Sequence, residues 1–254
     1  MWRDHAVLVT GATGGIGQHL CESLISAGAR VIAHGLHAEE VDALTARLGC
    51  EGLVCNFASL AAVRSVELPA IDVLINNAGI GFGANQLHRE TSADGHELRF
   101  AVNYLAAVLL TRRYLARGTL HAIVNVASAG QRALDFDDLQ TAHGYDGMTA
   151  YRRSKLAMVM WAFDLAERQP VPVVSLHPGT FLDTGMVRQS GITPLGTARH
   201  GAEMVRIAAE RALTNTTGVF FDEIEPARCD DQAYDASARA LLRERTDALL
   251  DSSC

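Results

Sequence analysis

Short apolar runs alternate with longer amphipathic segments along most of the chain. The runs short enough to be buried strands lie at residues 6–10, 31–33, 53–55, 71–76, 122–127, 173–177 and 218–221. The segments of helical composition lie at residues 18–27, 39–48, 98–115, 149–168, 198–213 and 236–250. Strands that are apolar at every position, and not at every second one, are typical of a parallel sheet covered on both faces. The pattern therefore predicts an α/β fold, a doubly wound parallel sheet with helices on both faces.

The length and composition fit one globular domain. The chain has 254 residues, of which 48% are hydrophobic and 20% are charged. This is long for a small domain and short for two full ones, so we expect a single domain over residues 1–254. The formal net charge is −7 and the sequence contains no basic stripe, which argues against a nucleic-acid partner.

Cysteine usage and the first residues indicate the compartment. The five cysteines include no pair with the C-x-x-C spacing of a metal site, so we expect free thiols in a reducing compartment and no bound metal. The first residues run directly into the first strand and lack the basic and apolar regions of a signal peptide. No apolar stretch reaches the ~20 residues that span a bilayer. We therefore expect a cytoplasmic protein with no membrane partner.

A glycine-rich turn joins the first predicted strand to the first predicted helix. It reads Thr10-Gly11-Ala12-Thr13-Gly14-Gly15-Ile16-Gly17. Such a turn lets the backbone approach a pyrophosphate, and the helix that follows offers free N–H groups and a partial positive charge. We therefore predict a Rossmann-type dinucleotide site with contacts at Gly11, Thr13, Gly15, Ile16 and Gly17. The spacing also fits a pattern with Gly14 as the middle glycine, and the turn alone does not decide between the two.

The end of the second strand usually reports the choice between NAD and NADP. Here it reads His34-Gly35-Leu36-His37, with neither a carboxylate for the ribose hydroxyls nor an arginine for a 2′-phosphate. Because a carboxylate would repel that phosphate, its absence favours NADP over NAD, with His34 or His37 as the candidate donor. On the alternative interpretation, both histidines are ordinary solvent-facing residues. We include His34 and Gly35 among the cofactor contacts.

A tyrosine and a lysine lie four residues apart in the segment 149–168. On a helix, Tyr151 and Lys155 would share one face, which by itself also fits an exposed surface pair. The surroundings favour chemistry instead, because Ser128 follows the strand at 122–127 and Asn76-Asn77-Ala78-Gly79 ends the strand at 71–76. Open parallel sheets hold their ligands at the carboxyl ends of the strands.

Taken in order, these motifs resemble the short-chain dehydrogenase/reductase family in its single-domain branch. The resemblance covers nearly the whole chain and rests on residues 10–17, residues 76–79, Asn103, Ser128, Tyr151 with Lys155, and Pro178-Gly179. The long separation between Ser128 and Tyr151, with residues 134–139 inside it, resembles the retinol-dehydrogenase-like subgroup. The family pattern also selects Gly11, Gly15 and Gly17 as the three glycines of the turn.

The resemblance implies a catalytic group of Asn103, Ser128, Tyr151 and Lys155. A phenol has an ordinary pKa of about 10, which is high for proton transfer at neutral pH. The ammonium of Lys155 is expected to lower that pKa and to bind the nicotinamide ribose. Ser128 is expected to hold the substrate oxygen against Tyr151, and Asn103 is expected to hold a water that relays protons to Lys155.

The family pattern also implies cofactor contacts beyond the glycine turn. Besides Tyr151 and Lys155 they are Asn56, Phe57, Asn77, Ala78, Gly79, Pro178, Gly179, Thr180 and Thr184. Asn56 stands where the family often has an aspartate, and its amide oxygen can still accept a hydrogen bond from the adenine amino group. The family commonly has a threonine near the nicotinamide carboxamide. The usual spacing falls between Thr180 and Thr184, so the sequence does not select one.

The implied function is that of an NAD(P)-dependent oxidoreductase. It would move a hydride between nicotinamide and the carbonyl or alcohol carbon of a small, hydrophobic substrate. Two alternatives stay open: the same scaffold doing epimerisation, elimination or cyclisation, and a nucleotide-sensing protein without turnover. The intact Tyr151 and Lys155 argue against the second, because binding alone needs neither side chain.

A flap and a dimer face complete the expectations. Residues 183–199 are predicted to form a flap over the substrate. Apolar side chains in and beside this segment suit either a hydrophobic substrate or the core: Phe181, Leu182, Met186, Val187, Ile192 and Leu195. In the family, the helices corresponding to 98–115 and 149–168 often pair across a two-fold axis, which favours a homodimer. The residues expected on that face are Ala106, Ala107, Met158 and Trp161, and a monomer stays open if the insert covers them.

Overall fold

The computed structural model describes residues 1–83 and 85–251. Its centre is an eight-stranded sheet in the order β10-β9-β6-β5-β4-β1-β2-β3. The strands are β1 (Ala6–Val9), β2 (Arg30–Gly35), β3 (Glu51–Val54), β4 (Val73–Asn76), β5 (Ala122–Val126), β6 (Val173–His177), β9 (Val219–Asp222) and β10 (Glu225–Pro226). Neighbouring strands run parallel, except that β10 is antiparallel to β9. Because β1 pairs with β2 on one side and β4 on the other, the winding direction changes there, which is where such sheets bind ligands.

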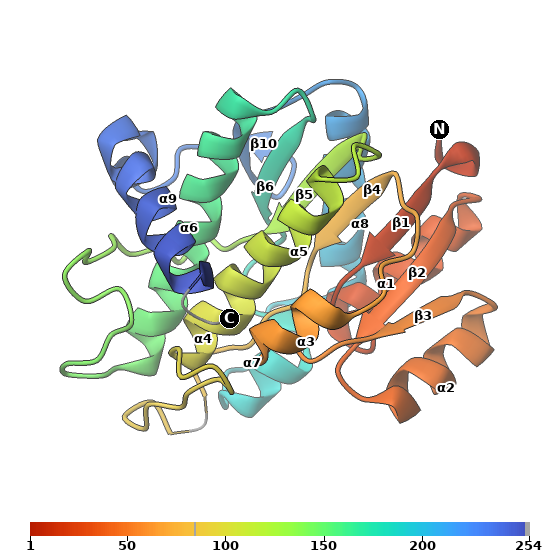
Figure 1. The fold of residues 1–254 in the computed structure, drawn as a ribbon. Coiled ribbons are helices and arrows are strands. Elements are labelled where there is room, and N and C mark those ends of the chain that lie inside the picture. Colours follow the sequence, from red (N-terminus) through yellow and green to blue (C-terminus); the bar gives the residue numbers. More distant parts are fainter. Residues whose placement is uncertain (84, 252–254) are drawn as a thin grey trace.

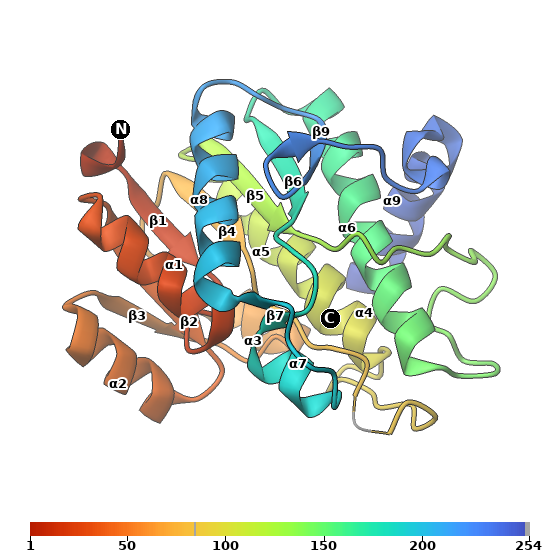
Figure 2. The same ribbon diagram turned by 180° about the vertical axis from the view of Figure 1, so that it is seen from behind.

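Helices cover both faces of the sheet (Figures 1 and 2). Figure 1 shows α5 (Ala106–Leu115) and α6 (Gly147–Arg168) in front of the strands, with α9 (Ala236–Asp251) beside α6. Seen from behind in Figure 2, α1 (Gly15–Ser26) and α8 (Ala198–Leu213) lie in front of the strands. The shorter helices are α2 (Ala38–Leu48), α3 (Leu60–Ser65) and α4 (Leu98–Phe100).

Each face of the sheet has its own apolar core. Leu8 of β1 belongs to the cluster under α5 and α6, whereas Val7 and Val9 belong to the cluster under α1 and α8. Successive side chains of a strand point to opposite faces, so a sheet covered twice needs an apolar residue at every position. This explains the uninterrupted apolar runs, and it confirms the predicted fold class.

Side chains before the helices fix where two of the longest ones begin. The carboxylate of Asp146 accepts a hydrogen bond from the Thr149 backbone N–H at the start of α6, at 2.8 Å. The hydroxyl of Thr197 accepts one from the His200 backbone N–H at the start of α8, at 3.1 Å. Each cap satisfies an N–H group that has no partner within its own helix.

The carboxyl ends of the parallel strands meet at one edge of the sheet, the lower edge in Figure 1. The loop residues 77–83, 85–97 and 127–146 gather there with β7 (Leu182–Asp183), α7 (Gly185–Gln189) and β8 (Gly196–Thr197). The predicted flap therefore has structure of its own, in which β7 and β8 pair in parallel. Its apolar residues divide between the two roles expected, since Leu182 is buried whereas Phe181 and Leu195 are exposed.

The helix predicted at 98–115 is wrong in one respect. Between α4 and α5 the residues Ala101–Leu105 form a π-helical turn, with hydrogen bonds one residue longer than in an α-helix. The hydrophobic period does not report such a turn, because one extra residue per turn shifts it only slightly. The elements α3, α7, β7, β8 and β10 also lie outside the predicted segments, because two to six residues carry too little periodicity to detect.

The predicted dimer face is covered by the chain itself. The four residues expected on it are buried within the monomer: Ala106, Ala107, Met158 and Trp161. Helix α9 packs along α6 there (Figure 1), and its Thr246 hydroxyl lies 2.7 Å from the Tyr104 hydroxyl. Arg243 of α9 pairs with Asp164 of α6. The four side chains named for that face are therefore not available to a second subunit, because α9, and not the insert that we considered, packs along α6; the homodimer itself stays a prediction.

Candidate active site

The glycine turn has the close approaches and backbone angles that only glycine allows. A Cβ atom on Gly17 would lie 2.1 Å from the Gly11 carbonyl oxygen and 2.8 Å from the Ala12 Cα. Gly15 has a φ of +51°, in the left-handed region. Gly14 is extended and a Cβ there would meet nothing, so this geometry requires Gly15 and Gly17 and not Gly14. The turn leaves the start of the 12-residue helix α1 bare of side chains, which fits a pyrophosphate.

The loop after β4 is bound directly to this turn. The Thr10 hydroxyl accepts hydrogen bonds from the backbone N–H groups of Asn77 and Ala78, both at 2.9 Å. The Asn77 amide donates to the carbonyl oxygens of Thr10 at 2.8 Å and Gly11 at 3.1 Å. Residues 77–79 therefore lie beside the glycine turn, as expected of cofactor contacts from two adjacent strands.

The structure contradicts the role expected for His34. Its imidazole is 3% exposed, and its Nδ1 accepts a hydrogen bond from the Gly11 backbone N–H at 3.1 Å. Its Nε2 lies 3.0 Å from the Cys55 carbonyl oxygen, and the ring stacks on Phe57 with 4.2 Å between centroids. Burial lowers the pKa of His34 to about 4. A neutral ring with both nitrogens occupied cannot bind a 2′-phosphate, nor does it face solvent.

The other residues expected at the adenosine end of the site differ in whether their side chains can still contact a dinucleotide. Gly35 packs against Thr13, where a Cβ would lie 2.5 Å from the threonine methyl group. The Asn56 side-chain oxygen accepts a hydrogen bond from the Ala58 backbone N–H at 2.8 Å, which leaves it one lone pair for an adenine. Phe57 is buried under His34, so its ring supports the site from below.

Tyr151 and Lys155 lie on one face of α6, where the lysine is buried and the tyrosine is half-buried. The Lys155 ammonium donates to the Val126 carbonyl oxygen at 2.9 Å and lies 5.8 Å from the centre of the Tyr151 ring. Ser128, just beyond β5, hydrogen-bonds to the Tyr151 side chain. The sheet edge therefore brings the predicted serine, tyrosine and lysine together, with the Ser128 hydroxyl also accepting from the Gly130 N–H at 3.0 Å.

The electrostatics of this group differ from the expectation. Burial raises the pKa of Tyr151, and the hydrogen bond with Ser128 lowers it only in part. Burial lowers the pKa of Lys155 to about 8. In the protein without dinucleotide, the loss of hydration on burial therefore sets the direction of both pKa shifts. The expected lowering of the tyrosine pKa by the lysine charge does not appear.

Asn103 lies in the π-helical turn and is fully buried. Its side-chain oxygen accepts from the Ile80 N–H at 2.8 Å, and its amide donates to the Ile80 carbonyl at 3.0 Å and to the Ser154 hydroxyl at 3.0 Å. Both donors of the amide are thus occupied by the protein. The asparagine holds the loop after β4 against α6, and only a second lone pair of its oxygen is left for the expected water.

The segment after β6 brings the two candidate threonines to different places. The Thr180 hydroxyl lies 3.0 Å from Nε2 of His177, whereas the Thr184 methyl group would lie 3.0 Å from a Cβ on Gly15. Pro178 and Gly179 form the link, and Gly179 has a φ of +126°. Thr184 therefore lies against the glycine turn, beside the expected pyrophosphate, and Thr180 points toward the end of β6.

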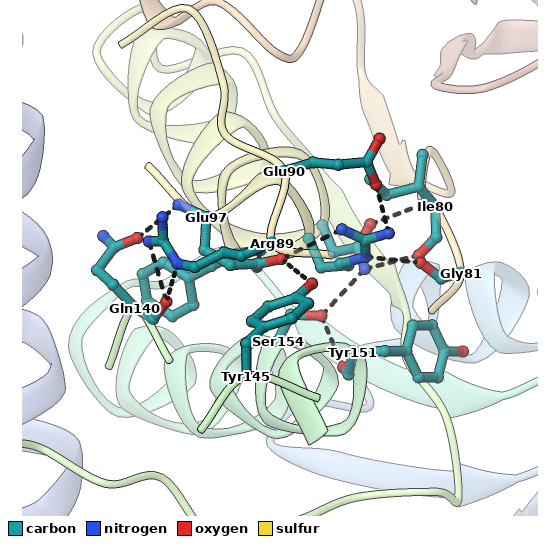
Figure 3. Close-up of polar contacts among 12 residues, drawn as sticks. Ile80, Gly81, Arg89, Glu90, Glu97, Gln140, Tyr145, Tyr151 and Ser154 are labelled. Atoms are coloured by element: carbon teal, nitrogen blue, oxygen red, sulfur yellow. Dashed lines mark hydrogen bonds and ion pairs between the residues drawn. The ribbon is translucent and has the colours of Figure 1, made fainter. Parts of the chain in front are cut away.

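A buried polar cluster on the substrate side was not predicted. Glu97 and Arg99 are each 1% exposed and form an ion pair with 3.5 Å between Nη1 and Oε1. The Tyr145 hydroxyl donates to Glu97 at 2.9 Å, and the Gln140 side-chain oxygen accepts from the Glu97 N–H at 2.7 Å (Figure 3). The available signal was a charged residue on each side of Leu98, at the start of the otherwise apolar predicted helix 98–115.

Comparison with known families places the chain beside dehydrogenases. The model of the short chain dehydrogenase family matches residues 5–194. A protein from Streptomyces sp. strain C5, provisionally named a daunorubicin C-13 ketoreductase, is 34% identical over 95% of this chain and 91% of its own length. Human retinol dehydrogenase 13 is 33% identical over 73% of this chain, and human retinol dehydrogenase 14 is 35% identical over 68%. The chain spans only 61% and 60% of the lengths of these two enzymes.

Solved structures agree on the fold. A protein from Mycobacterium paratuberculosis has a TM-score of 0.79 at 24% identity, covering 98% of this chain and 94% of its own. A serine dehydrogenase complexed with NADP+ has a TM-score of 0.67 at 24% identity, covering 85% of this chain and 93% of its own. At these identities the likeness concerns the fold alone. Within residues 1–83 and 85–251, no helix is both long and apolar enough to cross a bilayer.

Proposed function

Because the chain belongs to the short-chain dehydrogenase family, we propose that Tyr151, Lys155, Ser128 and Asn103 are the group with which it reduces a ketone of a small hydrophobic molecule. The chain is an NAD(P)-dependent oxidoreductase of this family. The observation that carries the proposal is the contact of Ser128 with Tyr151, beside the buried Lys155, at the carboxyl edge of the sheet.

The geometry of the glycine turn is the evidence for the proposed dinucleotide site. Gly15 and Gly17 leave the start of α1 open, Asn77 closes one side, and Thr184 lies over the turn on the other. The dinucleotide, when bound, supplies or accepts the hydride. All remaining steps belong to side chains of the protein, which bind, orient and move a proton.

In the reducing direction, Tyr151 gives its phenolic proton to the substrate oxygen. Ser128, hydrogen-bonded to that phenol, is placed to donate a hydrogen bond to the same oxygen. Lys155 lies 5.8 Å from the centre of the Tyr151 ring, and its pKa of about 8 keeps it charged at neutral pH, so it is placed to return a proton to the phenolate that is left. Asn103 fixes Ile80, and thereby the wall of the site, and its free lone pair can hold a water that leads the proton to solvent.

The ketone is proposed from the lining of the site together with the relatives. The Phe82 ring meets the Tyr151 ring edge-on, 6.2 Å between centroids, and Met186 of α7 lies against Gly81. These apolar side chains beside the phenol favour a hydrophobic substrate. The relative named as a ketoreductase matches almost end to end, whereas the retinol dehydrogenases match over about three fifths of their length, and we therefore favour ketone reduction over alcohol oxidation.

We propose NADP in preference to NAD as the cofactor, with one of the two candidate histidines now removed from the argument. Residues 34–37, at the end of β2, include no carboxylate to repel a 2′-phosphate, and with His34 buried the candidate donor in this segment is His37, just before α2. We expect a modest preference, because the segment also lacks an arginine.

The test is turnover of a carbonyl panel, followed as loss of the reduced-nicotinamide absorbance band. Tyr151→Phe should lower kcat by about 1000-fold or more while the dinucleotide Kd stays within about twofold. Turnover of the variant at the wild-type rate would reject the assignment of Tyr151. Product formation without consumption of the dinucleotide would instead indicate epimerisation, elimination or cyclisation.

A further inference from the structure

A buried arginine supports the loop that covers the catalytic tyrosine. Arg99 lies in α4, four residues before Asn103, and is 1% exposed. Its Nη2 donates to the Glu90 carboxylate at 2.7 Å, and its Nε donates to the Gly81 carbonyl oxygen at 3.1 Å. A Cβ on Gly83 would lie 2.3 Å from Nη2, so the loop rests directly on the guanidinium.

Two side chains from one helical segment thus hold two consecutive residues of this loop, Ile80 and Gly81. Asn103 holds both the N–H and the carbonyl of Ile80, and Arg99 holds the carbonyl of Gly81. The next residue is Phe82, whose ring lies at 84° to the Tyr151 ring. The position of Phe82 against the phenol therefore depends on the backbone bond that Arg99 makes.

The partner of Arg99 reaches the start of the catalytic helix. One carboxylate oxygen of Glu97 accepts from the Phe100 N–H at 2.7 Å, which caps α4, and the other accepts from the Tyr145 hydroxyl. Tyr145 immediately precedes Asp146, the cap of α6. Figure 3 shows Tyr145 beside Glu97, with Tyr151 and Ser154 further along the same helix. The cluster ties the start of α6 to the segment that carries Asn103.

We propose that Arg99, together with Glu97, is a positioning residue for the reaction: it holds Phe82 against Tyr151, which keeps water from the phenol and sets the apolar wall that the substrate meets. This rests on the proposed function, in which Tyr151 transfers the proton. An arginine suits the task because its planar fork holds a carbonyl and two carboxylates at once, whereas a lysine ammonium is a single point of charge.

The first experiment replaces Arg99 with lysine, which keeps the charge but cannot reach all three partners. We expect kcat to fall by about 10- to 100-fold, as for a misplaced reacting group, with the dinucleotide Kd within about twofold. The basic limb of the kcat/KM profile should move to lower pH, because water at the phenol relieves the burial that raises the pKa of Tyr151. Phe82→Leu should move the same limb in the same direction.

Arg239 offers a matched control. It is also a buried arginine, donating to the Ala233 carbonyl at 3.0 Å and pairing with Glu167, but it lies on α9, away from the site. Arg239→Lys should leave kcat and the pH profile unchanged. If Arg99→Lys does not fold, Tyr145→Phe removes only one hydroxyl from the cluster and should give a smaller change of the same kind.

Two outcomes separate this inference from the proposed function. If Tyr151→Phe is inactive while Arg99→Lys or Tyr145→Phe keeps the wild-type kcat and pH profile, the positioning role is overturned and the proposed function stands. If Tyr151→Phe keeps full turnover, the proposed function fails, whatever Arg99→Lys does.

Discussion

Replacing His34 tests how the cofactor end of the site is held together. Two consecutive amides of the glycine turn bind this one residue: Gly11 donates to its ring at 3.1 Å, and Ala12 donates to its carbonyl oxygen at 2.7 Å. On the other side, the ring reaches the Cys55 carbonyl at the end of β3. His34→Leu keeps an apolar group of similar size in the buried position but leaves the Gly11 N–H and the Cys55 carbonyl without the ring.

The expected loss follows from those two groups. Each buried polar group left without a partner costs about 1–3 kcal/mol, so with two such groups the free energy of unfolding should fall by roughly 2–6 kcal/mol, less if water reaches one of them. Because the Gly11 amide is no longer held, the turn should also lose its fixed shape, and the dinucleotide Kd should rise by about tenfold. His34→Asn should recover most of both losses, since its side-chain oxygen can stand where the imidazole Nδ1 accepts the Gly11 bond.

The pH dependence of stability provides a second test of the buried His34 imidazole. The pKa of His34 is lowered from 6.5 to about 4, so the unfolded chain binds a proton between these values that the folded protein excludes. Stability therefore falls as pH drops through this window. From pH 7 to pH 5 the loss through this group is about 2 kcal/mol, and His34→Asn should lack it.

The assays are urea unfolding at pH 7 and pH 5 and fluorescence titration with the dinucleotide. His121→Leu, at an exposed histidine away from the glycine turn, serves as the control and should change neither quantity. A folded His34→Leu protein with the wild-type Kd would refute the reasoning, as would a His34→Asn protein that loses stability toward pH 5 as steeply as the wild type.

Three further predictions follow from the site. Gly17→Ala should abolish dinucleotide binding, because its Cβ would meet the Gly11 oxygen at 2.1 Å, whereas Gly14→Ala, in open space, should leave the Kd unchanged; equal effects of the two would contradict the geometry. Lys155→Met should inactivate the enzyme yet stabilise the dinucleotide-free protein by up to ~3 kcal/mol below pH 8. Burial lowers the pKa of Lys155 from 10.5 to about 8, so burying the charged lysine costs the wild type stability below pH 8, and this stability returns only as pH rises from 8 to 10.5. A Lys155→Met protein that is less stable than the wild type in calorimetry at pH 7 would count against this prediction. His37→Ala should reduce the ratio of kcat/KM for NADP to that for NAD; an unchanged ratio would remove His37 from the cofactor site.

Much of this protein can be read from its sequence, because the signals are local. The strands are apolar at every position since each is covered on both faces, and Gly15 and Gly17 mark a turn whose geometry excludes side chains. Tyr151 and Lys155 need only helical spacing to share a face, and Ser128 needs only to end a strand at the ligand-binding edge. Each inference joins residues within one element or relies on the shared direction of parallel strands.

Tertiary structure decided what depends on contacts between distant segments. From the sequence, His34 is expected at the surface beside a phosphate, yet Gly11 of the glycine turn and Cys55 and Phe57 of the loop after β3 enclose it and keep it neutral. The helices expected to meet a second subunit are covered by α9, which begins about 70 residues after α6 ends and packs on it only in the folded chain. No local pattern in the sequence records that docking. Arg99 and Glu97 are likewise only two charged residues in the sequence. The fold places Arg99 under the loop that carries Phe82 and Glu97 beside Tyr145, because burial and hydrogen-bond partners are properties of the packed chain.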